Sequence, residues 1–108
     1  MRVLFDQGTP APLRRHLSRH SVETLAEKGW SDKDNGELLD LAEAQGYDVF
    51  VTTDQSLRHQ QNLVGRRIGI VVLLDTNWSQ VRRWVERVAA AVDSIQPGEV
   101  REVSLRDG

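Results

Sequence analysis

Two short apolar runs, each ending on an aspartate, are the sequence features that most constrain the fold of this chain. Residues 48–54 read Asp-Val-Phe-Val-Thr-Thr-Asp, a run that is too short for an ordinary helix and rich in strand-forming residues. Residues 2–5 have the same character, end on Asp6 and lead directly into a turn that contains glycine and proline. As neighbours in a parallel sheet, the two strands would bring Asp6 and Asp54 to its carboxyl edge, where open α/β folds bind ligands.

The composition is typical of a globular protein with a modest core. Of the 108 residues, 39% are hydrophobic and 28% are charged, so we expect residues 1–108 to form a single domain. No apolar run approaches the roughly 18 residues that span a bilayer, and the first residues follow a strand pattern instead of a signal-peptide pattern. We therefore expect a cytoplasmic protein that does not bind membranes.

The residue types limit which metals and partners are possible. There is no cysteine and the three histidines are scattered, so any bound metal is expected to have oxygen ligands. The net charge of −2 gives no overall attraction to nucleic acid, although several pairs of basic residues can still form a local patch.

The alternation of strands and helices predicts the fold class. We expect further strands at 20–25 and 68–74, and helices at 12–18, 34–46, 56–64 and 77–94, the last being the longest. Residues 97–108 are expected to form an edge strand and a frayed tail. The prediction is a three-layer α/β sandwich with right-handed crossovers and a mostly parallel central sheet of four to five strands, in which residues 48–53 lie between 2–5 and 68–74.

Two carboxylates that converge repel each other, so a divalent hard cation such as Mg²⁺ or Mn²⁺ is their natural partner. Such a site suits phosphoryl chemistry, because the metal activates water and neutralises charge on the phosphate. Aspartates also end strands simply as turn formers, and for Asp6 and Asp54 that alternative carries equal weight.

Other acids compete for the same site. Glu37 follows Asp34 by three residues, which fits helix capping, yet from the second helix it can also face the carboxyl edge. Asp75 ends the 68–74 strand and is a fourth candidate ligand, but the sequence Asp75-Thr-Asn favours a turn and helix cap.

Arginines near the strand ends are candidates for nucleic-acid contacts. Arg14, Arg15 and Arg58 lie in segments that follow a strand with a terminal acid, where they are placed to contact a phosphate backbone. The competing interpretation for each of them is a solvated surface position.

The combination of three motifs resembles the small PIN-like nuclease domains. The motifs are Val3-Leu-Phe-Asp6, Asn35-Gly-Glu-Leu-Leu-Asp-Leu-Ala42 and Val49-Phe-Val-Thr-Thr-Asp54, and the resemblance covers about the first three quarters of the chain. It implies an Mg²⁺- or Mn²⁺-dependent endoribonuclease in which Asp6, Glu37 and Asp54 hold the metal and Asn35 orients water or metal. Many bacterial members resemble toxins that pair with a small antitoxin, so RNA and an antitoxin are the implied partners, and a homodimer stays open.

The chain also departs from the family pattern. Many relatives have Asp-Glu-Asn where this chain has Asp6-Gln7-Gly8, and they have aspartate at the positions of Asn35 and Ser56. These differences favour an alternative in which a PIN-like scaffold with fewer acids binds RNA or a protein without cleaving. A third hypothesis, a phosphoacceptor receiver, is disfavoured because Asp6 is followed by Gln7 and no lysine lies beyond Lys33.

Overall fold

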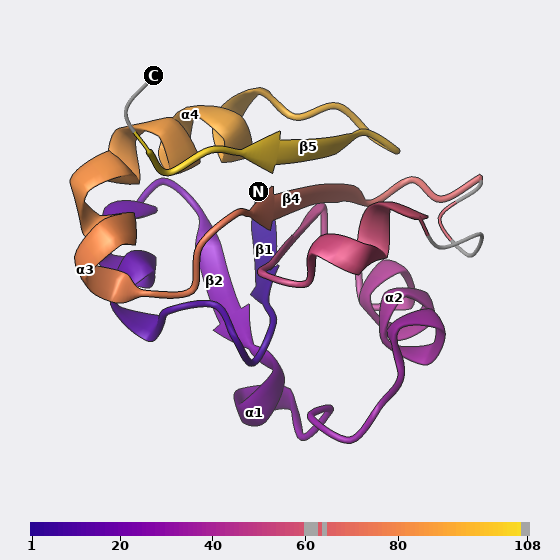
Figure 1. The fold of residues 1–108 in the computed structure, drawn as a ribbon. Helices are drawn as coiled ribbons and strands as arrows, with labels where there is room; N and C mark the ends of the chain where they lie inside the picture. Colours follow the sequence, from indigo (N-terminus) through magenta and orange to yellow (C-terminus); the bar gives the residue numbers. More distant parts are fainter. Residues whose placement is uncertain (60–62, 64, 107–108) are drawn as a thin grey trace.

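The sheet is the predicted one. A computed structural model describes residues 1–59, 63 and 65–106, without the side chains of residues 58 and 59. One five-stranded sheet has the order β2-β1-β3-β4-β5, and all neighbouring strands are parallel. The strands are β1 (Arg2–Phe5), β2 (Ser21–Thr24), β3 (Val49–Thr52), β4 (Gly69–Leu73) and β5 (Val100–Val103) (Figure 1). The prediction that β3 lies between β1 and β4 is confirmed.

Burial along the strands follows from their place in the sheet. Every residue of the central strands β3 and β4 is buried, as expected for strands covered on both faces. Successive side chains point to opposite faces, so Val49 and Val51 join one apolar cluster while Phe50 joins another. The edge strands β2 and β5 are less buried, and the predicted edge position of the last strand is confirmed.

Two helical layers cover the two faces, which confirms the three-layer α/β sandwich. We call the first helical layer the one formed by the 3-10 helices η1 (Ala11–His16) and η4 (Arg82–Trp84) with the α-helices α3 (Trp78–Val81) and α4 (Val85–Ser94). The second helical layer contains α1 (Leu25–Lys28), α2 (Asn35–Ala44) and the 3-10 helix η2 (Gln55–His59). Figure 1 shows α3 and α4 on the opposite side of the strands from α2.

The helices differ from the prediction in four places. The short helix α1 was not expected, and the expected helix at 56–64 is the 3-10 helix η2 in its described part, while residues 60–62 and 64 lie outside the described residues. The expected helix at 12–18 is a 3-10 helix, and the expected long helix at 77–94 is divided into α3, η4 and α4. The division contains no glycine or proline; it occurs at Trp84, whose φ of −126° and ψ of 25° leave the helical region. In the described part of the chain, no helix is long and apolar enough to cross a membrane.

The expectation that all crossovers are right-handed is wrong for one of them. The connection from β1 to β2 covers the face of the first helical layer. The connection from β2 to β3 runs back in the opposite direction over the face of the second helical layer, and the connection from β3 to β4 continues in that direction over the same face. These three connections therefore share one hand. The connection from β4 to β5 continues in the same direction but over the first-layer face, which gives it the opposite hand, a rare arrangement. The physical reason is coverage, because η1 alone is too short to bury the apolar face that α3 and α4 also cover.

Candidate functional site

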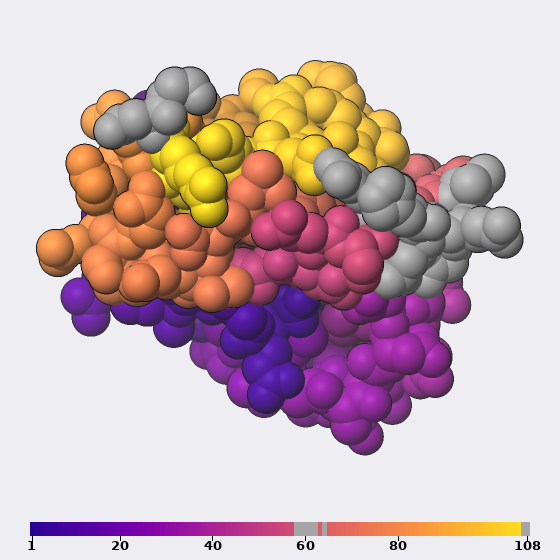
Figure 2. Space-filling view, viewed as in Figure 1, coloured from indigo at the N-terminus to yellow at the C-terminus, as the bar shows by residue number. Residues whose placement is uncertain are grey.

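The two predicted acids lie at the point where the winding direction of the sheet changes. The chain leaves β1 toward one side of the sheet and leaves β3 toward the other, and the carboxyl ends of two such strands are where open α/β sheets bind ligands. Asp6 directly follows β1 and Asp54 follows β3 by two residues. Figure 2 shows this edge of the molecule, where the segments after β1 (indigo), β3 (crimson) and β4 (orange) meet.

A buried threonine hydroxyl connects the two acids. The Oγ1 of Thr52 donates a hydrogen bond to Oδ2 of Asp6 at 2.6 Å and accepts one from the backbone N–H of Asp54 at 3.0 Å. Thr52 is 0% exposed, so its side chain has no freedom to turn toward solvent. The structure therefore brings Asp6 and Asp54 together through a single fixed side chain.

The turn after Asp6 is held against the end of β3. The backbone N–H of Gln7 donates to Oδ1 of Asp6 at 2.8 Å, and the buried hydroxyl of Thr9 donates to the carbonyl of Val51 at 2.9 Å. Gly8 allows this approach, because a Cβ at that position would lie only 2.5 Å from Oγ1 of Thr53. These contacts fix the direction of the Asp6 carboxylate.

Three neutral donors surround the carboxylate of Asp54. Oδ1 accepts hydrogen bonds from the hydroxyl and the backbone N–H of Ser56 at 2.6 and 3.0 Å, and Oδ2 accepts one from Nδ2 of Asn35 at 3.3 Å. The Ser56 hydroxyl makes the largest contribution to holding the pKa of Asp54 below its usual value, which outweighs the opposing effect of burial. Repulsion from Asp6, expected from the sequence, is not what sets the protonation of Asp54.

The start of α2 supplies one of its two candidate residues to this site. Asp34 caps the helix by accepting the backbone N–H of Glu37 at 2.9 Å, and Asn35 reaches Asp54. The Glu37 side chain is exposed and makes no hydrogen bond or ion pair with any described residue. Within the described residues, no three His, Cys, Asp or Glu side chains are grouped closely enough to hold a metal, so Glu37 does not complete a three-acid cluster with Asp6 and Asp54.

Asp75 takes the structural role that its sequence favours. Its Oδ1 accepts the backbone N–H of Asn77 at 2.8 Å, and Asn77 in turn caps α3 by accepting the N–H of Ser79 at 3.0 Å. Asp75 therefore forms the turn before a helix cap and makes no hydrogen bond with Asp6 or Asp54.

The structure describes the side chains of two of the three predicted arginines, and these two differ in their surroundings. Arg14 is paired with Glu27 at 2.5 Å, which neutralises most of its charge locally. Arg15 is exposed on η1. The side chain of Arg58 lies outside the described residues.

Sequence reasoning missed the roles of Thr52 and Ser56. A usable signal for Thr52 was a polar residue at a strand position whose neighbours predict complete burial, next to an acid. For Ser56 the signal was its place two residues after an aspartate at a turn, where a short polar side chain bonds back to the carboxylate. Both residues were visible in the segment Thr-Thr-Asp-Gln-Ser.

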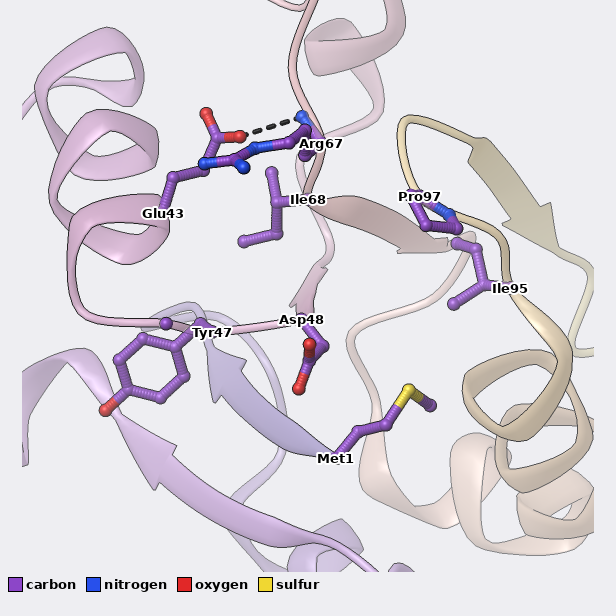
Figure 3. A pocket seen from close by; sticks show the side chains of 9 residues that line it. Met1, Glu43, Tyr47, Asp48, Arg67, Ile68, Ile95 and Pro97 are labelled. Atoms are coloured by element: carbon purple, nitrogen blue, oxygen red, sulfur yellow. Dashed lines mark hydrogen bonds between the residues drawn. The ribbon is translucent and has the colours of Figure 1, made fainter.

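A hollow of about 390 Å³ lies at the opposite edge of the sheet, where the strands begin, and the two acids do not line it (Figure 3). Two of its acidic side chains already have partners. The backbone N–H of Arg67 donates to Glu43 at 2.7 Å, and Oδ2 of Asp48 accepts the backbone N–H of Arg2 at 2.9 Å. We therefore place the candidate chemistry at the carboxyl edge, where the charge is not balanced.

Comparison of this chain with protein-family models, with curated proteins and with solved structures finds no match to any of the three.

Proposed function

We propose that this protein is a PIN-like, metal-dependent endoribonuclease whose cation is held by Asp6 and Asp54. The observation that carries the proposal is the type of partner these acids have. All the hydrogen bonds that they accept from described residues come from neutral donors, namely Gln7, Thr52, Ser56 and Asn35. Two negatively charged side chains thus lie at the carboxyl edge and accept no hydrogen bond from a cationic side chain of the described residues, which favours binding of a divalent ion.

The residues present fit such an ion. Asp6 and Asp54 offer hard carboxylate oxygens, and because Asn35 donates through Nδ2, its carbonyl oxygen stays available. Mg²⁺ is commonly bound by only one or two carboxylates together with water and substrate phosphate, so a third acid is not required. When bound, a cation of this kind supplies an activated water and neutralises charge on a phosphodiester.

The other residues support this reaction in secondary ways. Thr52 and Ser56 fix the directions of the two carboxylates, so that little reorganisation is needed when a cation binds. Asn35 orients water or metal, and Glu37, exposed in the same helical turn as Asn35, is the third acid that a bound substrate would recruit. RNA is the proposed substrate, and a toxin role in the cytoplasm with a small antitoxin as partner is the proposed biological setting.

A second function is favoured by one specific observation. No cluster of three acids exists in the described residues, and each oxygen of Asp6 and Asp54 already accepts a hydrogen bond. A PIN-like scaffold of this kind could bind RNA or a protein partner without cleaving.

Cleavage assays separate the two functions. Purified protein should cut single-stranded RNA in Mn²⁺ or Mg²⁺, lose activity in chelator, and lose it again in Asp6→Asn and in Asp54→Asn. Asp48→Asn is a matched control, since Asp48 is an exposed acid at the opposite edge and its loss should leave cleavage unchanged. RNA binding without any metal-dependent cleavage would establish the binding module instead.

A metal-binding assay tests the site independently of cleavage. Mn²⁺ at 100 times its dissociation constant should stabilise the protein by about 2.7 kcal/mol, and Asp54→Asn should abolish the rise in melting temperature. Ser56→Asp restores the acid found in relatives, so it should tighten Mn²⁺ binding while lowering the stability of the metal-free protein through charge repulsion. If Ser56→Asp and wild type bind Mn²⁺ equally weakly, the carboxyl edge is not a cation site.

A further inference from the structure

Positive charge is concentrated on the first helical layer. Together with its adjoining turns, residues 10–19 and 76–94, this layer carries six arginines and two acidic residues, Glu86 and Asp93, of which Asp93 lies 2.6 Å from the ring of His20. The arginines are Arg14, Arg15, Arg19, Arg82, Arg83 and Arg87. Of the 14 basic and 16 acidic residues in the chain, this leaves eight basic and fourteen acidic ones for the rest, so a net charge of only −2 is compatible with a basic first helical layer and an acidic remainder.

Most of these arginines are free to bind a ligand. Arg14 is paired with Glu27, and Arg87 stacks on the ring of Trp84 while donating to two backbone carbonyls. The other four, Arg15, Arg19, Arg82 and Arg83, are exposed and make no hydrogen bond or ion pair with a described residue. A surface with several unpaired guanidinium groups and only two acids attracts a polyanion.

An aromatic pair lies within the same layer. The rings of His16 at the end of η1 and Trp78 at the start of α3 have their centroids 5.8 Å apart, with 40° between their planes. His16 is exposed and Trp78 is half-buried, so both rings present area to solvent. Exposed rings next to guanidinium groups are what successive unpaired bases stack on, whereas a duplex keeps its bases out of reach.

The layer is continuous with the edge that carries the acids. η1 begins shortly after Asp6, and α3 begins shortly after β4 ends at the same edge. In Figure 2 the orange surface of the segment that includes α3 borders the indigo and crimson surfaces that follow β1 and β3. A strand whose phosphate is at Asp6 and Asp54 can therefore continue directly onto Trp78.

We propose that the first helical layer is the path of a single-stranded RNA leaving the acids, with a base stacked on Trp78 and His16 and the phosphates contacted by Arg15, Arg82 and Arg83. The inference rests on the proposed function for the identity of the strand, and it assigns residues that the prediction of Arg14, Arg15 and Arg58 did not include. Binding through this layer does not require the metal.

Anisotropy of a short fluorescein-labelled oligouridylate in chelator tests the path without cleavage. Arg82→Gln/Arg83→Gln should lower the slope of log affinity against log salt by about 1.4, since each phosphate contact to a single strand contributes about 0.7. Lys33→Gln/Arg67→Gln makes the same charge change at exposed positions outside the layer and should leave the slope unchanged. Trp78→Leu should weaken binding about tenfold, and because Trp78 also packs on the core, exposed His16→Ala provides a second test that should weaken binding to a smaller extent.

The outcomes are distinct. Equal slopes for the two charge pairs, unchanged affinity in both ring variants, or equal affinity for an RNA duplex or for polyglutamate would each overturn the proposed path. Loss of binding in the layer variants from a protein that never cleaves RNA would support the path while contradicting the nuclease function. Metal-dependent cleavage by a protein whose layer variants bind RNA as tightly as wild type would support the nuclease function and contradict the proposed path.

Discussion

The acids at the two edges of the sheet have different kinds of partner. At the amino edge, where the strands begin, Glu43 is paired with Arg66 at 2.8 Å, and Arg2 and Tyr47 reach from this edge to donate hydrogen bonds to Glu23 within β2. At the carboxyl edge, Asp6 and Asp54 are held by hydroxyl, amide and backbone N–H groups alone, as far as the described residues show. The first arrangement neutralises charge, whereas the second only orients it.

The difference shows what each edge is able to do. A carboxylate with a guanidinium partner has its charge balanced by the protein, and removal of that partner destabilises the fold. A carboxylate with neutral donors is fixed in direction yet keeps its full charge. Three of the four carboxylate oxygens of Asp6 and Asp54 accept only one hydrogen bond each, which leaves a lone pair free for a cation. Only the second kind of site is prepared for an added cation, and this is why the hollow at the amino edge is the weaker candidate in spite of its volume.

The largest expected effect is at the amino edge. Arg66 has a side chain only 12% exposed and bonds to Glu43 and Asp40 at 2.8 and 2.9 Å. Arg66→Met should cost about 3 kcal/mol in unfolding free energy, measured in urea, because it leaves the half-buried Glu43 without a cation. Arg101→Met breaks the more exposed pair with Glu99 and should cost less than about 1 kcal/mol. Equal losses in the two variants would show that charge pairing does not define the amino edge.

The next effect is at the carboxyl edge and involves no charge change. Thr52→Val keeps the size of the side chain but removes the donor to Asp6 and the acceptor of the Asp54 N–H. The free energy of unfolding should therefore fall by about 2 kcal/mol. Thr53→Val is the matched control, because the neighbouring hydroxyl makes no hydrogen bond with a described residue. A Thr52 variant as stable as the Thr53 variant would remove Thr52 as the link between the acids.

The strands and their order were predictable because local sequence determines them. Short β-branched runs such as 49–52 have few alternatives to a buried strand, and parallel pairing then forces Asp6 and Asp54 to one edge. The capping box of Thr24 with Glu27, which starts the short helix α1, was also readable from the sequence, although no helix was predicted there.

Other features depend on contacts that no local pattern encodes. The hand of the last crossover is decided by which face still needs covering, a property of the whole sheet. The bond from Thr52 to Asp6 joins residues 46 apart in sequence and requires the register of β1 on β3. The lowered pKa of Asp54 likewise depends on Ser56 and on Asn35, which reaches it from another element. The acids were predictable as candidates, whereas their neutral surroundings were not.

A smaller effect is expected at the amino edge, where the pKa of Tyr47 is raised. Burial, together with a 2.5 Å hydrogen bond to Glu23, raises the pKa of Tyr47 to about 12. Because the folded pKa lies above the ordinary value of 10.0, the stabilisation is complete below pH 10 and is lost as the pH rises toward about 12. Tyr47 is the single tyrosine of the chain, so tyrosinate absorbance reports its pKa directly. Tyr47→Phe should cost about 1 kcal/mol at neutral pH, and a tyrosine titrating near pH 10 would contradict the assignment.

The smallest effect tests the neutral donors of the carboxyl edge through pH. The Ser56 hydroxyl is the main cause of the lowered pKa of Asp54, so Ser56→Ala should move that pKa upward and cost about 0.5 to 1 kcal/mol at neutral pH. A group with a depressed folded pKa stabilises the protein above its unfolded value, here 3.8, and stops doing so as the pH falls through the folded pKa. The stability difference between wild type and Ser56→Ala should therefore be constant from pH 7 to about 5 and disappear below 3.8. Carboxyl NMR titration measures the pKa of Asp54 directly. Ser79→Ala removes a serine hydroxyl that bonds to Asn77 at the start of α3, and as a control it should leave the pKa of Asp54 unchanged. A difference that persists at low pH would mean that Ser56 acts through packing, and the carboxyl edge would then lose one of the donors that keep its acid ionised.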